Sequence, residues 1–237
     1  METVEMNKNC IVIFSGGLDS TVLLQYVKQQ GYNIYGMSFL YGQRHSKELH
    51  FAKKLGNKYC EKHKILILDF MKDIARHSAL TGKIQLPTNI HQEHETQKAT
   101  VVPNRNAVML SIATAWAEDL HISKIFYGAH RGDFIIYPDC RKKFVKYLSK
   151  AFQVGTYSNV KIEAPFVKLY KSELIKKGIE LKVDFKNTWT CYEGKKVACG
   201  VCGSCKERIE AFKKNKLIDP IKYNVNVDWS DCKEIKY

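Results

Sequence analysis

Apolar runs and helix-like segments alternate along the first 70 residues of the chain. Three short apolar runs have the length and composition of buried parallel strands, at residues 10–14, 34–40 and 64–70. Between them, residues 21–30 and 46–59 read as helices, and Gly31 is a natural end for the first one. This order predicts a right-handed, mostly parallel sheet with helices on both faces.

The second half of the chain continues this alternation after an interruption at residues 75–102. That segment is polar and contains Pro87, and we interpret it as a lid over an active site. Beyond it we expect helices at 106–120, 139–152, 172–179 and 204–214 and strands at 124–128 and 160–164. The sequence therefore predicts a doubly wound, Rossmann-like α/β domain at 1–186 and a small C-terminal region at 187–237.

A glycine-containing turn, SGGLDS at residues 15–20, joins the first expected strand to the first helix. Its two glycines allow the backbone to approach an anion closely, and the helix N-terminus adds unpaired N–H groups. Ser15 and Ser20 add hydroxyl donors, and Asp19 is a suitable Mg²⁺ ligand. The turn matches neither a Walker A loop nor a dinucleotide-binding fingerprint. We interpret it as a phosphate-binding loop rather than a plain connection.

Four of the eight cysteines lie close together near the C-terminus, with the spacing C-x7-C-x2-C-x2-C: Cys191, Cys199, Cys202 and Cys205. Paired C-x2-C turns present thiolates to one tetrahedral Zn²⁺, and neighbouring glycines supply the turns. A [4Fe–4S] cluster is the main alternative, because similar spacing occurs in ferredoxins. With all four sulfurs committed to the ion, we expect a structural zinc site.

The chain is strongly basic, with a net charge of +14 from 38 Lys+Arg against 24 Asp+Glu. Only six of these residues are arginine, the preferred contact for phosphates and bases, and the lysines scatter along the expected helices. Solvated helix faces are therefore favoured over an RNA-binding surface. No apolar run approaches the ~18 residues of a membrane helix, and the N-terminus lacks a signal-peptide pattern. We expect a cytoplasmic protein.

The SGGLDS loop resembles that of the PP-loop ATP pyrophosphatases. That family cleaves ATP between the α- and β-phosphates, adenylates a carboxylate or carbonyl oxygen and releases pyrophosphate held by the loop. Such chemistry depends on positioning and charge neutralisation.

A narrower resemblance extends over most of the chain. It is carried by the segments FSGGLDS at 14–20, YGQRH at 41–45, VPNRN at 102–106, YPDCR at 137–141, and TCYEG with CGVCGSCKER within 190–208. The chain resembles the 7-cyano-7-deazaguanine synthase family of queuosine and archaeosine biosynthesis. That family uses ATP and ammonia to convert 7-carboxy-7-deazaguanine to an amide and then to a nitrile. The resemblance implies ATP, Mg²⁺ and Zn²⁺ as cofactors and a homodimer that does not bind nucleic acid directly.

The resemblance also assigns roles to individual residues. The ATP-binding set is Phe14, Ser15, Gly16, Gly17, Leu18, Asp19, Ser20, Thr21, Val22, Leu23 and Leu24. The expected catalytic residues are Asp19, Arg105 and Lys171, although an exposed lysine is the favoured alternative for Lys171 and a surface salt bridge the alternative for Arg105. The expected substrate-binding residues are Arg44, His45, Asp133, Tyr137, Asp139 and Arg141.

One segment departs from the family pattern. Ile135 and Ile136 stand where a serine and a glycine are usual, which stiffens the loop and removes a hydroxyl from the expected substrate wall. A related ligase acting on another carboxylate therefore stays open. A PP-loop enzyme that modifies tRNA is a second alternative. A binding module with an inactive loop fits poorly, because the SGGLDS motif is intact.

Overall fold

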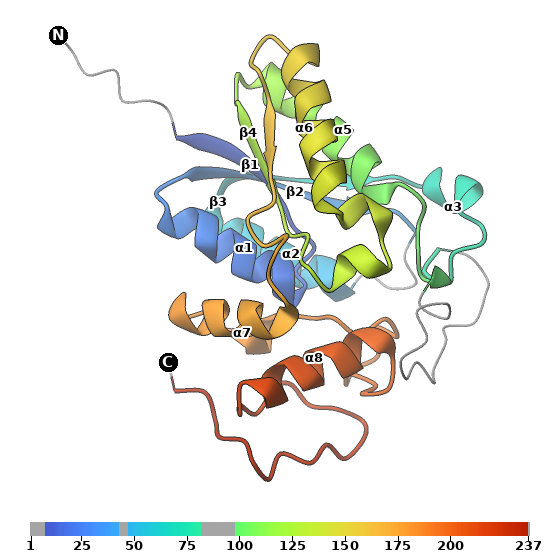
Figure 1. The fold of residues 1–237 in the computed structure, drawn as a ribbon, viewed down its shortest axis with the longest axis vertical. Coiled ribbons are helices and arrows are strands. Elements are labelled where there is room, and N and C mark those ends of the chain that lie inside the picture. The colour runs from blue at the N-terminus through green and yellow to red at the C-terminus, as the bar shows by residue number, and fades with distance from the viewer. Residues whose placement is uncertain (1–7, 43–46, 82–97, 237) are drawn as a thin grey trace, which may run out of the picture.

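A five-stranded, fully parallel sheet forms the centre of the molecule (Figure 1). The computed structural model describes residues 8–42, 47–81 and 98–236. The strands are β1 Asn9–Ile13, β2 Asn33–Leu40, β3 Cys60–Ile67, β4 Lys124–Tyr127 and β5 Lys161–Glu163. Their order is β3-β2-β1-β4-β5, so successive strands are added on one side of β1 up to β3 and on its other side from β4 onward. Ligands of open α/β sheets bind beyond the carboxyl ends of the strands at such a switch point.

Helices cover both faces of this sheet. The α-helices described are α1 Leu18–Gln29, α2 Lys47–Tyr59, α3 Met71–Ile74, α5 Arg105–Asp119, α6 Lys142–Gly155, α7 Lys171–Glu180 and α8 Gly203–Lys214. Three short 3₁₀ turns accompany them, η1 Asp133–Ile135, η2 Pro138–Cys140 and η3 Phe185–Asn187. Figure 1 shows α7 and α8 side by side, at the opposite end of the view from α5 and α6. The predicted doubly wound α/β fold is confirmed.

The alternation of side chains along β1 explains how both faces are filled. Cys10 and Val12 pack in a cluster with residues of α1, α2, α7 and α8, whereas Ile11 packs with residues of α5 on the other face. Successive strand side chains point to opposite faces, so a strand covered on both sides must be apolar throughout. This is why the run at 10–14 contains no polar residue.

Two predicted elements have different bounds in the structure. β3 occupies Cys60–Ile67 rather than 64–70, because it is an edge strand whose first half is exposed and carries the polar pair Glu61 and Lys62. The helix expected at 139–152 is divided into η2 and α6, since Arg141 is extended and caps a helix that begins at Lys142. The remaining predicted strands and helices are confirmed to within a few residues.

The segment expected to form a lid lies mostly outside the described residues, since 82–97 are not among them. Its two ends are joined by a hydrogen bond of 2.6 Å from the Ala79 N–H to the Ala99 carbonyl. The division at residue 186 stays a prediction, but Phe212 of α8 packs in the same cluster as Val22 of α1. Among the described residues, no helix is long and apolar enough to cross a bilayer.

Candidate active site and metal centre

A cavity of about 600 Å³ lies beyond the carboxyl ends of β1 and β4. The SGGLDS loop follows β1, and the loop from Gly128 to Asp133 follows β4. Because β1 and β4 are parallel neighbours, their carboxyl ends bring these two loops together. The carboxyl end of β2 and the first turns of α2, α5, α7 and α8 also contribute to the lining.

The SGGLDS loop is held in shape by its own hydrogen bonds. The Ser20 hydroxyl donates to the Gly17 carbonyl at 3.1 Å and accepts the Ser15 N–H at 3.1 Å, and the Ser15 hydroxyl accepts the Gly17 N–H at 3.1 Å. Gly16 has φ +85°, and a Cβ there would lie 2.4 Å from the Glu48 carbonyl oxygen. Only glycine fits this position, so α2 packs directly against the loop.

The expected ATP-binding residues divide into two groups. Phe14, Ser15, Gly17, Asp19 and Ser20 line the cavity. The others do not line it: Gly16 contacts α2, and the side chains of Leu18, Thr21, Val22, Leu23 and Leu24 are buried in the core. α1 begins at Leu18, so these residues support the loop from the inner face of the helix.

Lys171 is buried at the cavity wall, with 7% of its side chain exposed. The expectation of an exposed lysine is therefore wrong. Its ammonium lies 3.2 Å from Asp19 Oδ2 and 2.6 Å from Glu207 Oε2. Burial lowers the pKa of Lys171, but the neighbouring carboxylates raise it by more. The net pKa is therefore raised, and the ammonium stays charged. Burial raises the pKa of Asp19, but the positive charges of Lys171 and its other neighbours together outweigh this effect, so the net pKa is lowered.

Arg105 begins α5 and lines the cavity. Its Nη1 donates to the Tyr41 hydroxyl at 2.8 Å, and its guanidinium lies 5.1 Å from the Tyr41 ring centre. The expected alternative of a surface salt bridge is thus not what the structure has. Desolvation lowers the pKa of Arg105, but neighbouring Tyr41 and Asp139 raise it, so the guanidinium is a fixed positive charge.

The expected substrate-binding residues are only partly on the cavity wall. Asp133 and Tyr137 line it, and the Tyr137 hydroxyl is 2.8 Å from Thr100 Oγ1. Asp139 is buried behind the wall, where it accepts the N–H of Asn106 at 2.8 Å. The Arg141 Nε donates to the Phe134 carbonyl at 3.1 Å, outside the lining. Arg44 and His45 lie outside the described residues.

The expected wall position of Asp139 and Arg141 is therefore corrected. Pro138 and the 3₁₀ turn η2 direct the Asp139 side chain back toward the N-terminus of α5. A carboxylate there satisfies an unpaired helix N–H and interacts favourably with the helix dipole.

Three functional candidates were missed by the sequence reasoning: Glu48, His130 and Glu207. Burial raises the pKa of Glu48 to about 7, opposed by a hydrogen bond from Ser15 and the charge of Arg105. His130 is 1% exposed and lies among three carboxylates. His130 is the third residue after β4 at the switch point, so strand position was a usable signal. Glu48 and Glu207 sit on helices, where a single charge carries no such signal.

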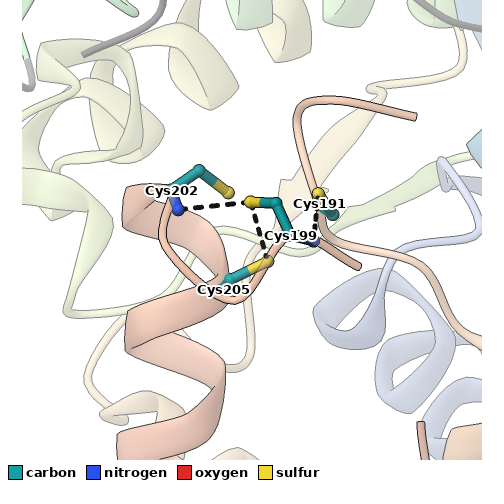
Figure 2. A group of neighbouring side chains, drawn as sticks. All are labelled: Cys191, Cys199, Cys202 and Cys205. Carbon is teal, nitrogen blue, oxygen red and sulfur yellow. Dashed lines mark hydrogen bonds between the residues drawn. The ribbon is translucent and has the colours of Figure 1, made fainter. Parts of the chain in front are cut away.

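The four clustered cysteines are buried, and Figure 2 shows their side chains gathered together. Their sulfurs all lie within 4.8 Å of one another, and the Cys199 and Cys205 sulfurs are 3.9 Å apart. A tetrahedral zinc ion with arms of ~2.3 Å places its sulfurs about 3.8 Å apart. A [4Fe–4S] cluster binds its thiolates to four different irons and requires a wider cage. The donor set fits one zinc ion.

Backbone groups around the cysteines also fit thiolates. The Cys199 N–H donates to the Cys191 sulfur and the Cys202 N–H to the Cys199 sulfur, both at 3.3 Å. Such donors stabilise the negative charge that metal-bound sulfur retains. The centre is closed by four protein ligands, which makes it structural rather than catalytic.

The metal centre positions one wall of the cavity. Cys202 caps α8 and Cys205 lies in its first turn, so Glu207 follows within the same helix and reaches Lys171. Arg208 is fully buried on the opposite side and pairs with Asp219 through two bonds of 2.7 and 3.0 Å. The metal ligands Cys202 and Cys205 and the Arg208–Asp219 pair therefore hold the first turns of α8 in place.

The C-terminal region also contacts the SGGLDS loop and α2 directly. The Trp189 N–H donates to the Gly16 carbonyl at 3.2 Å. Lys47 lies 3.4 Å from the centre of the Trp189 ring and donates to the carbonyls of Lys195 and Lys196. These contacts would transmit a movement of the metal centre to the SGGLDS loop.

Together the fold, loop and cavity define an α/β protein of the PP-loop nucleotide-binding class with an attached four-cysteine centre. Residues 9–216 match the family described as queuosine biosynthesis protein QueC. The chain belongs to this family.

Named relatives cover nearly the whole chain. A 7-cyano-7-deazaguanine synthase of Caldicellulosiruptor saccharolyticus is 49% identical over 92% of this chain and 97% of its own length. A 7-cyano-7-deazaguanine synthase of Marinomonas sp. is 42% identical over 92% of this chain and 99% of its own length. Among solved structures, NMN synthetase from Francisella tularensis aligns with a TM-score of 0.47 and 15% identity, over 75% of this chain and 63% of that chain. That structural likeness carries no functional argument.

Proposed function

We propose that this protein uses ATP to convert 7-carboxy-7-deazaguanine and ammonia to 7-cyano-7-deazaguanine in queuosine or archaeosine biosynthesis. The observation that carries the proposal is the cavity itself, where the SGGLDS loop, Lys171 and Arg105 surround one space in a chain of the QueC family. The choice of substrate rests on the relatives named 7-cyano-7-deazaguanine synthase. A tRNA-modifying activity is not favoured.

In this proposal the loop residues Ser15, Gly17 and Ser20 bind the outer phosphates of ATP. Asp19 holds Mg²⁺, which neutralises charge on the phosphate oxygens. Lys171 and Arg105 add two fixed positive charges at the cavity wall, which suit phosphate and carboxylate groups. The substrate carboxylate attacks the α-phosphorus, and pyrophosphate leaves. Ammonia then displaces AMP to give the amide. A second ATP adenylates the amide oxygen with loss of pyrophosphate, and AMP leaves with that oxygen while the nitrogen loses its protons, which gives the nitrile.

The substrate ring is assigned to the wall formed by Asp133 and Tyr137. An ionised Asp133 accepts hydrogen bonds, which suits the ring N–H and amino group of a deazaguanine. Ile135 and Ile136 line the same wall and give it an apolar surface in place of a hydroxyl. Asp139 and Arg141 act from behind the wall, by holding α5 and the Phe134 carbonyl in place.

We place the protein in the cytoplasm as a homodimer that acts on small molecules and does not bind nucleic acid directly. Exposed apolar side chains of α6, Tyr147 at 64% and Val154 at 88%, support a second copy at this helix. Light scattering at micromolar concentration tests the dimer, since a monomer mass would contradict it.

The activity is tested by incubating the protein with 7-carboxy-7-deazaguanine, ATP, Mg²⁺ and ammonium. Mass spectrometry should detect the amide and then the nitrile. In the absence of ammonium, acid-dependent exchange between ATP and labelled pyrophosphate should report the adenylation step alone. ATP binding without exchange or turnover would contradict this substrate and favour a ligase acting on a different carboxylate.

A further inference from the structure

Glu48 places a carboxylate on the cavity wall beside the SGGLDS loop. It lies in the first turn of α2, and a Cβ on Gly17 would lie 4.0 Å from its Oε1. Asp19 and Glu207, two other acidic residues of the lining, share the ammonium of Lys171. The ion pairs that the described residues form with one another do not include Glu48. Its carboxylate therefore has acceptor capacity left for a molecule in the cavity.

The groups around Glu48 are those that the proposed reaction uses. Ser15 hydrogen-bonds to its carboxylate from the loop, and the charges of Arg105 and Lys171 act on it from the first residues of α5 and α7. In the proposed function these three residues bind phosphate and carboxylate groups. A proton acceptor among them is close to the carbonyl carbon that ammonia attacks, so it can act without diffusing to its target.

The charge state of Glu48 suits proton transfer near neutral pH. Burial is the largest effect and raises its pKa to about 7, and Asp19 raises it as well, whereas Ser15, Arg105 and Lys171 lower it. A general base works best when its pKa lies near the working pH, and a carboxylate of ordinary pKa is a weaker base. The pKa of Asp19 is lowered instead, so that carboxylate is a poor proton acceptor.

We propose that Glu48 is the general base that removes a proton from ammonium at the adenylated acid. Ammonium has no lone pair for attack, so one proton must leave first, and the Glu48 carboxylate takes it. The nitrogen then bonds to the carbonyl carbon, and the bond from that carbon to the AMP oxygen breaks with its electron pair leaving on AMP. A second proton passes from the nitrogen to solvent, which gives the amide. The inference rests on the proposed function and adds the catalytic residue of its amidation step.

Glu48→Gln tests this role, because it keeps the shape of the side chain and removes the base. At pH 7 we expect amide formation from ammonium to fall roughly a hundredfold. Acid-dependent exchange between ATP and pyrophosphate should stay within about threefold of wild type, because adenylation needs no base. Hydroxylamine is mostly neutral at this pH, so its conversion to the hydroxamate should fall less than about fivefold. Glu61→Gln, exposed on β3 and outside the lining, should change none of these rates by more than about twofold.

The pH dependence of amidation gives a second measurement. Above pH 7 the wild-type rate should level off, because Glu48 is then ionised and most of the substrate is still ammonium. The Glu48→Gln protein depends on free ammonia from solution, whose concentration rises about tenfold per pH unit. Its deficit should therefore shrink about tenfold per unit above pH 7 and nearly vanish at pH 9.

Three results would overturn the role of Glu48. Unchanged amidation, or equal losses with ammonium and hydroxylamine, would show that the carboxylate does not take the proton. A deficit of the same size at pH 7 and pH 9 would show the same. A loss of exchange as large as the loss of amidation would assign Glu48 to nucleotide binding instead. Any of these results beside a wild-type protein that exchanges pyrophosphate refutes this inference alone, whereas a wild-type protein without acid-dependent exchange refutes the proposed function itself.

Discussion

At the scale of single residues, Glu48 stands out because its charge is poorly tolerated in the folded chain. It is partly buried at the cavity wall, near Ser15 of the loop. Burial raises its pKa from 4.5 to about 7, and Arg105 and Lys171 offset only part of this effect. Folding therefore takes up a proton at this side chain near neutral pH.

The raised pKa of Glu48 gives a pH-dependent stability prediction. Between pH 4.5 and 7 the folded chain holds a proton that the unfolded chain has lost, so the free energy of unfolding falls as pH rises through this window. Glu48→Gln removes this loss. We expect the variant to be more stable than wild type by roughly 1–2 kcal/mol at pH 8 and to show no such gain below pH 4.5.

Urea unfolding of both proteins across this pH range measures the difference. Glu61→Gln, at an exposed position of β3, controls for the loss of one negative charge. A stability gain that is the same at every pH would contradict the assigned cause.

At the scale of elements, the start of α5 depends on a residue from another segment. Asn104 has a left-handed backbone with φ 55°, and no side chain of its own caps the helix. Asp139 supplies the acceptor instead, through its bond of 2.8 Å to the Asn106 N–H. This contact also fixes Arg105, the first residue of the helix, at the cavity.

Removing this cap should weaken the fold and the site together. We expect Asp139→Ala to lower the free energy of unfolding by about 1–2 kcal/mol, because a helix N–H loses its partner. Asp139→Asn keeps one acceptor oxygen and should cost less than half as much. Denaturant unfolding measures both, and equal losses for the two variants would show that the carboxylate charge, not the cap, is responsible.

How much of these elements the sequence predicts depends on where each lies in the sheet. β1 and β2 are covered on both faces, so their apolar runs mark them clearly. β3 lies at the edge and starts with polar residues, so its first half gave no signal. The family resemblance placed Asp139 at the substrate. No local sequence pattern shows that a 3₁₀ turn instead directs its side chain toward a helix about 33 residues earlier.

At the scale of the whole molecule, the metal centre and the nucleotide loop form one connected unit. The sequence predicts the loop and the four cysteines separately, because each is a compact motif. It does not predict that Glu207 meets Lys171 or that Trp189 bonds to Gly16, since contacts between distant segments leave no periodic pattern. The two motifs together shape the cavity.

Metal removal should therefore affect catalysis through α8 and through the Trp189 contact with the SGGLDS loop, although no zinc ligand lies in that loop. We expect one zinc ion per chain by metal analysis, and its removal by a chelator should lower the melting temperature. Pyrophosphate exchange should fall at least tenfold as α8 loses its fixed start, and added zinc should restore it. Iron in place of zinc would contradict the assigned metal. Full exchange in zinc-free protein assayed with Mg²⁺ would contradict the coupling between the metal centre and catalysis.

The buried Arg208–Asp219 pair has a practical meaning for anyone who trims the chain. The family match ends at residue 216, and a cut there would look harmless. It would remove Asp219 and leave the guanidinium of Arg208 buried without its carboxylate partner, since neither side chain is exposed to solvent. Leaving one member of such a pair alone typically costs about 3–5 kcal/mol, a large share of what holds a domain folded. Shortened versions should keep the residues through Tyr223, whose hydroxyl donates to Asp219.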